Sequence, residues 1–318
     1  MKALITGAAG FIGSTLAGRL VAEGVDTVGI DSLTDYYDPA LKRDNISHLA
    51  DQWQFVEEDL NRVDLGDLLA DVQVVFHLAG QPGVRKSWGS AFDTYVAQNI
   101  QATQRLLEAA RTSPSRPRIV YASSSSIYGD AETYPTDENT VPRPRSPYGV
   151  TKLAAEHLCR LYSANYGLET VSLRFFTVYG PRQRPDMAFT RFLRAADAGA
   201  PIGLYGTGEQ VRDFTFVDDI VEAVLRAAEA DVAPGSVLNV SGGGSHSVNE
   251  VLALMEQLVG KPLDIVRSDT ALGDVSRTSA DIGAARTALG WAPRVGIEEG
   301  LRAQLKWVRA TESVAARA

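Results

Sequence analysis

The chain has 318 residues and a formal net charge of −8, from 31 Lys and Arg against 39 Asp and Glu. This length suits one large domain or two modest ones, and 45% apolar residues are ordinary for a chain with a real core. The acidic balance argues against broad nucleic-acid binding, although a few arginines can hold a phosphate locally. A lone cysteine, Cys159, excludes an internal disulfide, and four scattered histidines argue against a dedicated metal site.

No targeting or membrane segment is expected. No basic start precedes an apolar run, and no apolar stretch reaches the roughly 18 residues of a membrane span. A chain with one cysteine also fits a reducing compartment. We therefore expect a cytoplasmic protein without a membrane or nucleic-acid partner.

The first half of the sequence alternates strands with helices. Strands are predicted at Lys2–Thr6, Thr27–Ile30, Gln54–Val56, Val72–His77, Arg118–Ala122 and Val171–Phe176. Helices are predicted at Phe11–Ala22, Ala91–Ala110 and Pro147–Asn165, the last with Ser146 as N-cap and Gly167 just past its end. This alternation is typical of an α/β fold with a doubly wound parallel sheet.

After residue 176 the pattern changes to short elements separated by prolines. We predict a nucleotide-binding domain over 1–176 and a smaller, interleaved C-terminal substrate lobe over 177–318, from which about 213–240 return to the first domain. A ligand should bind beyond the carboxyl ends of the strands, between the two lobes.

A glycine-rich loop follows the first strand and opens the first helix, with the sequence Gly7-Ala-Ala-Gly10-Phe11-Ile12-Gly13. The first glycine permits the tight turn, the second lets the backbone approach a pyrophosphate, and the third allows close packing of helix on strand. The helix N-terminus offers free N–H groups to the phosphates. The loop therefore predicts dinucleotide binding on a Rossmann-type sheet.

Two acids follow later strands of this sheet. Asp31 ends the second strand, where a carboxylate accepts the ribose hydroxyls of adenosine and repels the extra phosphate of NADP. NAD is therefore the expected cofactor, although Asp31 could also begin a turn. Asp59 and Leu60 follow the third strand and are assigned to the adenine edge, with a helix cap as the alternative.

Tyr148 and Lys152 stand four residues apart in a predicted helix, so they point to one face. A nearby ammonium stabilises a phenolate, which makes Tyr148 a usable general base for a sugar hydroxyl. The run Ser123–Ser126 follows the strand Arg118–Ala122, where its hydroxyls can bridge a substrate and the Tyr oxygen. The alternatives are a solvated helix face and a turn that satisfies its own backbone.

These motifs together resemble the extended short-chain dehydrogenase/reductase family, in its nucleotide-sugar epimerase/dehydratase branch. The resemblance covers nearly the whole chain and includes three more segments: FHLAG (Phe76–Gly80), RFFTVYGP (Arg174–Pro181) and RDFTFVDDI (Arg212–Ile220). It implies a tightly held, recycled NAD, with Ser124 as the catalytic hydroxyl, Tyr148 as the base and Lys152 as its partner. Further cofactor contacts are implied at Leu78, Ala79, Gly80, Asn99 and Phe175. Asn99 could equally be an exposed polar residue of its helix.

The substrate follows from finer features of the resemblance. Dehydratases and decarboxylases of this branch typically carry an acid where Ser124-Ser125 stand, which favours an epimerase. UDP-glucose 4-epimerases usually carry Asn and Arg where this chain has Thr177 and Ala271. The segments Asp35–Arg43, Gly83–Arg85 and Gly180–Met187 resemble UDP-glucuronic acid 4-epimerases instead. The expected substrate pair is therefore UDP-glucuronate and UDP-galacturonate.

The residues implied to bind this UDP-sugar are Arg85, Ser124, Ser125, Ser126, Thr177, Arg184, Met187, Arg212, Asp274 and Arg277. Arg184, Thr177 and the serines would surround the sugar carboxylate. Arg212 and Arg277 are the candidates for the diphosphate and Asp274 for the uridine ribose, although Arg277 could equally be a surface charge. The helices Ala91–Ala110 and Pro147–Asn165 form the dimer interface of family members, so a homodimer is expected.

The nearest alternative is a UDP-glucose/UDP-galactose 4-epimerase, which a substrate panel would separate from the first prediction. A UDP-glucuronate decarboxylase is disfavoured because the acid is missing. A non-catalytic, NAD-bound sensor is disfavoured because Ser124, Tyr148 and Lys152 are intact, although fold alone never proves activity.

Overall fold

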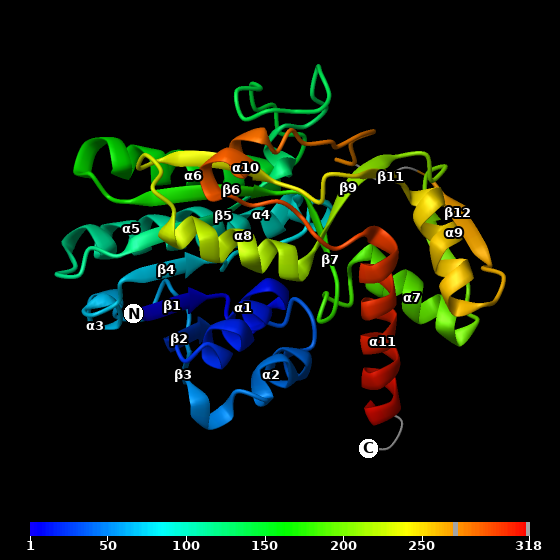
Figure 1. Cartoon of the computed structure of the whole chain (residues 1–318), viewed down its shortest axis with the longest axis horizontal. Helices are drawn as coiled ribbons and strands as arrows, with labels where there is room; N and C mark the ends of the chain where they lie inside the picture. Colours follow the sequence, from blue (N-terminus) through cyan, green and yellow to red (C-terminus); the bar gives the residue numbers. More distant parts are fainter. Residues whose placement is uncertain (270–272, 316–318) are drawn as a thin grey trace.

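The computed structural model describes residues 1–269 and 273–315 (Figure 1). A seven-stranded parallel sheet forms its centre, in the order β10-β6-β5-β4-β1-β2-β3. The strands are β1 (Lys2–Thr6), β2 (Asp26–Asp31), β3 (Gln54–Glu57), β4 (Val74–His77), β5 (Arg118–Ser124), β6 (Thr170–Phe175) and β10 (Ser236–Val240). Apart from the edge strand β3, most of their residues are buried, as expected of strands covered on both faces.

Helices cover both faces of this sheet, each over its own hydrophobic cluster. On one face α1 (Phe11–Ala22) packs beside α8 (Val217–Glu229), and α2 (Pro39–Ser47) packs on α1. On the other face α5 (Ala102–Thr112) lies between α3 (Leu65–Leu69) and α6 (Pro147–Tyr166). The predicted α/β class with a doubly wound, Rossmann-type parallel sheet is confirmed.

The predicted helix Ala91–Ala110 is not one regular helix. The chain forms α4 (Phe92–Tyr95), then a π-helical segment at Val96–Gln101, and only then α5. A π-helical segment carries i→i+5 hydrogen bonds and rotates its side chains relative to the α-helical stripe. That rotation turns Asn99 into the interior, where it is 2% exposed. The continuous-helix prediction was wrong at this point.

The remaining elements form a smaller lobe beside the carboxyl ends of the sheet (Figure 1, right). Its strands are β7 (Thr177–Tyr179), β9 (Val211–Phe216) and β11 (Ser245–Ser247) in one sheet, and β8 (Ile202–Tyr205) with β12 (Ile265–Ser268) in another. Its helices are α7 (Ala188–Ala198), α9 (Val248–Val259) and α11 (Ile297–Ala315), while α10 (Gly283–Leu289) packs against β10. The domain boundary at residue 176 stays a prediction.

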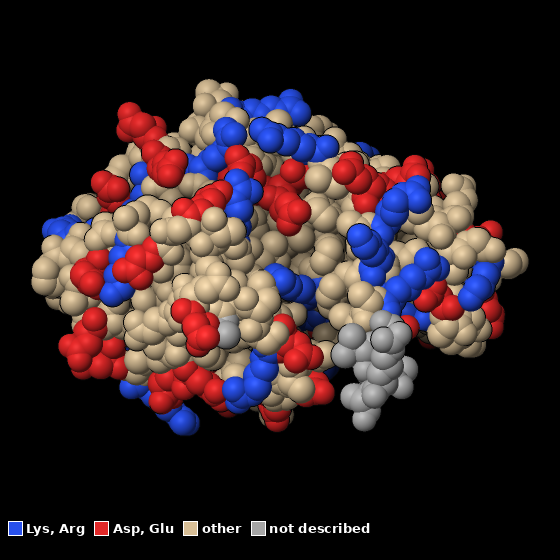
Figure 2. Space-filling model, turned by 60° about the horizontal axis from the view of Figure 1, so that its bottom comes forward, with Lys and Arg blue, Asp and Glu red and all other residues tan. Residues whose placement is uncertain are grey.

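Strand β10 comes late in the sequence yet pairs with β6 at the edge of the main sheet, so the chain crosses between the two parts more than once. The face in Figure 2 carries interspersed acidic and basic side chains, and the net charge is not gathered in one patch on it. None of the helices that the structure describes is both long and apolar enough to cross a membrane. Nor do the described residues include a group of His, Cys, Asp and Glu that could hold a metal ion.

Candidate active site

The glycine loop between β1 and α1 has no room for side chains at two of its positions. A Cβ on Gly7, whose φ is +69°, would lie 2.8 Å from the backbone nitrogen of Ala79, and one on Gly13 would lie 2.1 Å from the carbonyl oxygen of Gly7. The helix therefore begins directly against the loop, with Gly10 as an N-cap that offers no side chain. Its first N–H groups are free to bind an anion.

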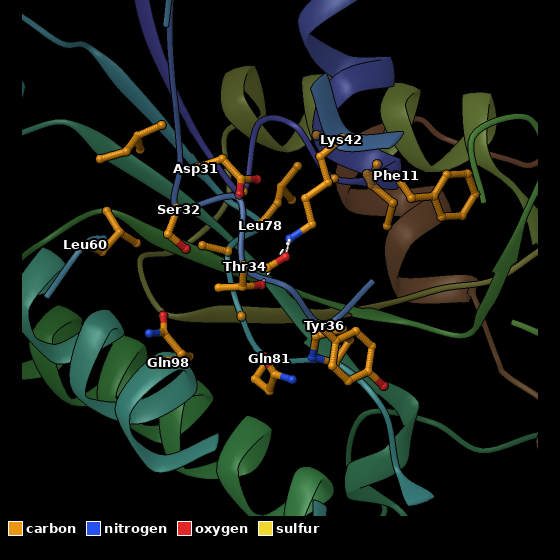
Figure 3. A pocket seen from close by; sticks show the side chains of 18 of the residues that line it. Phe11, Asp31, Ser32, Thr34, Tyr36, Lys42, Leu60, Leu78, Gln81 and Gln98 are labelled. Atoms are coloured by element: carbon orange, nitrogen blue, oxygen red, sulfur yellow. Dashed lines mark hydrogen bonds between the residues drawn. The ribbon is translucent and has the colours of Figure 1, made fainter. Parts of the chain in front are cut away.

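A cavity opens beside this loop, which forms one of its walls; we call it the first cavity (Figure 3). Its lining includes these predicted cofactor residues: Gly7, Gly10, Phe11, Ile12, Gly13, Asp31, Leu60, Leu78, Ala79 and Gly80. Asp59, Asn99 and Phe175 do not line it. Asp59 instead accepts a hydrogen bond from Gln98 Nε2 at 2.9 Å, and Gln98 and Glu58 line the wall near Leu60. The lining residues of this cavity fit a dinucleotide.

Asp31 lies at the adenosine end expected for such a ligand. Its carboxylate accepts the backbone N–H of Ala9 at 3.1 Å and of Leu33 at 2.9 Å. Burial raises the pKa of Asp31, and these N–H groups and the charge of Lys42 oppose the rise. Lys42 reaches into the same cavity from α2 and donates to Thr34 O at 2.7 Å and Thr34 Oγ1 at 3.0 Å (Figure 3).

Tyr148 and Lys152 lie in the first two turns of α6, where Lys152 is buried and Tyr148 is half-buried. Burial raises the pKa of Tyr148, while a hydrogen bond with Ser124 and the charge of Arg184 lower it. Burial lowers the pKa of Lys152 to about 8, against the opposing effects of Cys159 and Glu156. The charge of Arg184 thus acts on Tyr148, which the helical spacing of Tyr148 and Lys152 did not indicate.

Asn99 supports the first cavity from behind. Its Oδ1 accepts the N–H of Gln81 at 2.6 Å, and its Nδ2 donates to Gln81 O at 3.1 Å and to Thr151 Oγ1 at 2.9 Å. These bonds fix the Gly80–Gln81 backbone, which lines the cavity, to the helix that carries Lys152. The alternative of an exposed helix residue was wrong, because Asn99 is buried.

A second cavity opens beside the serine run. It is lined by Val84, Ser125, Ser126, Gly129, Arg145, Ser146, Thr177, Arg212, Gly273, Asp274, Val275 and Thr278. Arg212 donates to Val211 O at 2.8 Å and Val275 O at 2.5 Å, and burial lowers its pKa. Because the hydrogen bonds of its guanidinium among the described residues go to backbone carbonyls, the charge of Arg212 remains available for an anion such as a diphosphate.

The other predicted substrate residues lie around these two cavities. Arg85 pairs with Asp274 at 3.0 Å, and its guanidinium lies 4.2 Å from the centre of the Tyr205 ring. Arg184 lines the first cavity rather than the second. Ser124 lies at the end of β5 and caps the next turn through Ser126 N–H at 3.1 Å.

Two further predicted substrate residues lie outside both linings. Met187 precedes α7 without lining either cavity. Arg277 is exposed and lies over the ring of Tyr134 at 5.2 Å, so its alternative as a surface charge fits the structure better than a diphosphate contact. Ala271 lies outside the described residues.

The structure adds pocket residues that sequence reasoning missed. Lys42 and Tyr36 line the first cavity, and Arg145 lines the second. The segment Asp35–Arg43 contains two of them and drew attention only as part of a resemblance. Arg145 stands in a proline-rich loop and carried no sequence signal, since such loops are commonly exposed.

The glycine loop, the acid at the end of β2 and the Ser–Tyr–Lys group define a dinucleotide-dependent enzyme of the short-chain dehydrogenase type. The sequence model of the NAD dependent epimerase/dehydratase family matches residues 3–241, so the chain belongs to this family. The predicted family, its NAD cofactor and an epimerase-type enzyme are confirmed at this level.

Individual relatives are similar over nearly the whole length. The uncharacterized UDP-glucose epimerase YtcB of Bacillus subtilis is 42% identical, over 97% of this chain and 98% of its own. A UDP-glucuronate 4-epimerase of Thermodesulfobacterium geofontis is 36% identical, over 96% and 95%. The crystal structure of UDP-glucuronic acid 4-epimerase from Bacillus cereus, in complex with UDP-glucuronic acid and NAD, is 40% identical over 98% of this chain and 100% of its own, with a TM-score of 0.94.

Proposed function

We propose that this protein is a UDP-glucuronic acid 4-epimerase, which interconverts UDP-glucuronate and UDP-galacturonate. The observation that carries the proposal is the position of Arg184, whose guanidinium lines the first cavity and acts electrostatically on Tyr148. A cation beside the catalytic phenol suits a sugar with a carboxylate next to the reacting carbon. The similarity to relatives named for this activity supports it.

The reaction begins at the sugar 4-hydroxyl, from which Tyr148 removes the proton. The chemistry that NAD supplies when bound is reversible hydride transfer at carbon 4, through a 4-keto sugar that turns over between the two transfers. Ser124 hydrogen-bonds to the phenol, and Arg184 stabilises the phenolate. Lys152, buried behind the Gly80 backbone, supplies the positive charge on the cofactor side.

UDP has to stay anchored while the sugar turns. Arg212 offers its charge to the diphosphate in the second cavity, which Arg145 also lines while paired with Asp130. Asp274 suits the uridine ribose, and its pairing with Arg85 fixes the orientation of its carboxylate. Thr177, Ser125 and Ser126 line the same cavity and would offer hydroxyls to the sugar.

A 4-keto uronic acid is a β-keto acid, and it loses carbon dioxide when the carboxylate bond stands perpendicular to the carbonyl plane. Charge-assisted hydrogen bonds from Arg184, together with the Thr177 and serine hydroxyls, would keep the carboxylate away from that angle. This requirement separates an epimerase from a decarboxylase that shares its first step.

The test is a substrate panel on the purified protein. We expect UDP-glucuronate to give UDP-galacturonate, with UDP-glucose turned over far more slowly and no UDP-pentose released. Nuclear magnetic resonance of the sugar anomeric protons distinguishes all of these products. Preferential conversion of UDP-glucose to UDP-galactose would overturn the proposed substrate.

UDP-glucose/UDP-galactose epimerisation is the second candidate. A specific observation favours it: Arg184 is already paired with Asp186, so part of its charge is neutralised before a substrate carboxylate arrives. The similarity to YtcB points the same way. The substrate panel decides between the two candidates.

We also propose a homodimer in the cytoplasm. Exposed apolar side chains on α6, namely Val150 and Leu161, support a helical interface of the kind that the family resemblance implies. The buried Cys159, the lone cysteine of the sequence, fits a reducing compartment. Sedimentation at micromolar concentration tests the dimer, and Leu161→Glu should shift it to monomer.

A further inference from the structure

Arg184 enters the first cavity already bound to a neighbour. Its Nε and Nη2 donate hydrogen bonds to the two carboxylate oxygens of Asp186, and each bond is 2.9 Å long. The side chains are only 18% and 29% exposed, so water weakens this pair less than it weakens a surface ion pair. Burial works against the charge of Arg184, but the Asp186 carboxylate outweighs it and the pKa of Arg184 rises.

The guanidinium of Arg184 is also restrained from another side. It lies over the ring of Tyr36, 5.8 Å from the ring centre. The Tyr36 hydroxyl lies against the Gly83 backbone, where a Cβ would come within 2.3 Å of it. The ion pair and this ring contact therefore restrain the orientation of Arg184 before any ligand binds.

One edge of the guanidinium remains open. Asp186 occupies the edge formed by Nε and Nη2, and Nη1 has no acceptor in the part of the chain that the structure describes. A guanidinium presents five N–H donors in a fixed fork, so the edge with Nη1 can still take a second carboxylate. Two carboxylates on one arginine share its charge and repel each other, and each is then held less strongly than it would be alone.

We propose that Asp186 is a positioning residue, which orients Arg184 toward the substrate and weakens the hold of Arg184 on the sugar carboxylate. The inference rests on the proposed function, because only a uronic acid brings the second carboxylate. A 4-epimerase must present both faces of one sugar to the same cofactor, so the carboxylate has to leave Arg184 and bind again during each turnover. A tighter hold on the ground state adds nothing to the rate and obstructs this motion.

The test replaces Asp186 by Asn, which keeps the shape of the side chain and removes its charge. With Arg184 no longer shared, we expect the KM for UDP-glucuronate to fall roughly tenfold and kcat to fall by a similar factor, the size of one charge-assisted hydrogen bond. The kinetic constants for UDP-glucose should change little. A residue that merely supports the fold would not lower KM, and Asp186→Glu should restore much of the wild-type behaviour.

The matched control is Asp197→Asn. Asp197 also accepts both Nε and Nη2 of an arginine, Arg309, at 2.9 and 2.6 Å, but it lies on α7 and lines neither cavity. Titration calorimetry in a Tyr148→Phe background gives a second readout, in which Asp186→Asn should tighten UDP-glucuronate binding by the same factor.

The two ideas fail in different ways. A wild-type enzyme that does not convert UDP-glucuronate overturns the proposed function, and the role of Asp186 falls with it. If the wild-type enzyme converts UDP-glucuronate, the Asp186→Asn variant decides the second question. An unchanged or higher KM, with unchanged or weaker binding, overturns the role of Asp186 alone.

Discussion

At the scale of single residues, burial acts on the two catalytic groups of α6 in opposite directions. It raises the pKa of Tyr148 and lowers that of Lys152 to about 8. Tyr148 therefore keeps its proton at neutral pH although the charge of Arg184 favours ionisation. A further positive charge, such as that of bound NAD, would lower the pKa of Tyr148 more, so we expect proton removal from the sugar to depend on an occupied cofactor site.

Tyr148→Phe removes the proton acceptor and leaves the ring in place. General base catalysis contributes roughly 10²- to 10⁴-fold, so kcat should fall by about that range. NAD and UDP-sugar affinities, measured by titration calorimetry, should stay within a few-fold of the wild type. Tyr162→Phe, the same change farther along α6, serves as the control and should keep kcat. A Tyr148→Phe variant with more than a tenth of wild-type turnover would contradict the assignment.

Asp31 and Lys42 carry opposite charges in the wall of the first cavity, where we expect the adenosine part of the cofactor to bind. Asp31→Asn removes the charge that repels a ribose 2′-phosphate and leaves the Lys42 ammonium to attract it. We expect NADP affinity to rise at least roughly tenfold, as for a new charge-assisted hydrogen bond, while NAD affinity falls. Dissociation constants from protein fluorescence quenching measure both.

The double variant Asp31→Asn/Lys42→Met is the matched control for this change. It should lose the gained NADP affinity, because the remaining attraction comes from Lys42. If the single and the double variant bind NADP equally, Lys42 has no part in cofactor choice.

Sequence reasoning located the residues whose chemistry is visible in a local pattern. The glycine loop, Asp31, Tyr148 and Lys152 each stand at a fixed spacing next to a strand or helix end. Asp186 and Lys42 were missed because their importance comes from what they face: Lys42 from α2 toward Asp31, and Asp186 toward the guanidinium of Arg184. An acid two residues from an arginine has no distinctive spacing in a sequence.

At the scale of elements, the π-helical segment Val96–Gln101 is the feature that a sequence pattern could not reveal. Its apolar residues keep a spacing compatible with a continuous α-helix, and only the contacts of Asn99 with Gln81 and Thr151 show why the turn widens. The strands were easier to predict, because most contain a short apolar stretch that ends at a polar or glycine-containing loop. Strand β4 begins at Val74 rather than Val72, since Val72 N–H closes a turn with Leu69 O at 3.3 Å.

Asn99→Leu tests the role of this segment. The change removes three hydrogen bonds and leaves the Gln81 N–H without its acceptor, which costs about 1–3 kcal/mol of folding free energy. NAD affinity should fall because the Gly80–Gln81 backbone lines the cavity. Thermal unfolding with and without NAD separates the two effects.

Gln104→Leu is the control on the same helical stretch, since Gln104 donates to Tyr162 Oη at 3.1 Å and lines no part of the first cavity. It should leave NAD affinity unchanged. Equal NAD affinity in Asn99→Leu and the wild type would show that the segment supports only the fold.

At the scale of the whole molecule, His77 on β4 connects the neighbouring strand β1 with helix α5 through hydrogen bonds. Its Nδ1 lies 2.8 Å from Thr6 Oγ1, and its Nε2 lies 2.9 Å from Thr103 Oγ1. Thr6 Oγ1 also accepts the N–H of Ala79, and Thr103 Oγ1 donates to Asn99 O. The pattern is complete when His77 is neutral, accepts at Nδ1 and donates from Nε2.

Burial lowers the pKa of His77 to about 3, against 6.5 for an ordinary histidine. Between these values the unfolded chain binds a proton that the folded protein excludes, so stability is full above pH 6.5 and is lost as the pH falls. The loss from this group approaches about 1.4 kcal/mol per pH unit below pH 6. Chemical denaturation at pH 7 and pH 5 should show a decrease of roughly 2 kcal/mol in the wild type.

His77→Asn should lower stability at pH 7, because the chain of hydrogen bonds is interrupted, yet make the unfolding free energy less sensitive to pH between 7 and 5. The exposed His157→Gln is the control and should retain the wild-type slope. An equally steep slope in His77→Asn would mean that other groups cause the acid sensitivity. A flatter slope would show that His77 causes the loss of stability in acid. His77 contacts Thr6, which accepts the N–H of Ala79 in the wall of the first cavity. NAD binding should then weaken over the same pH range.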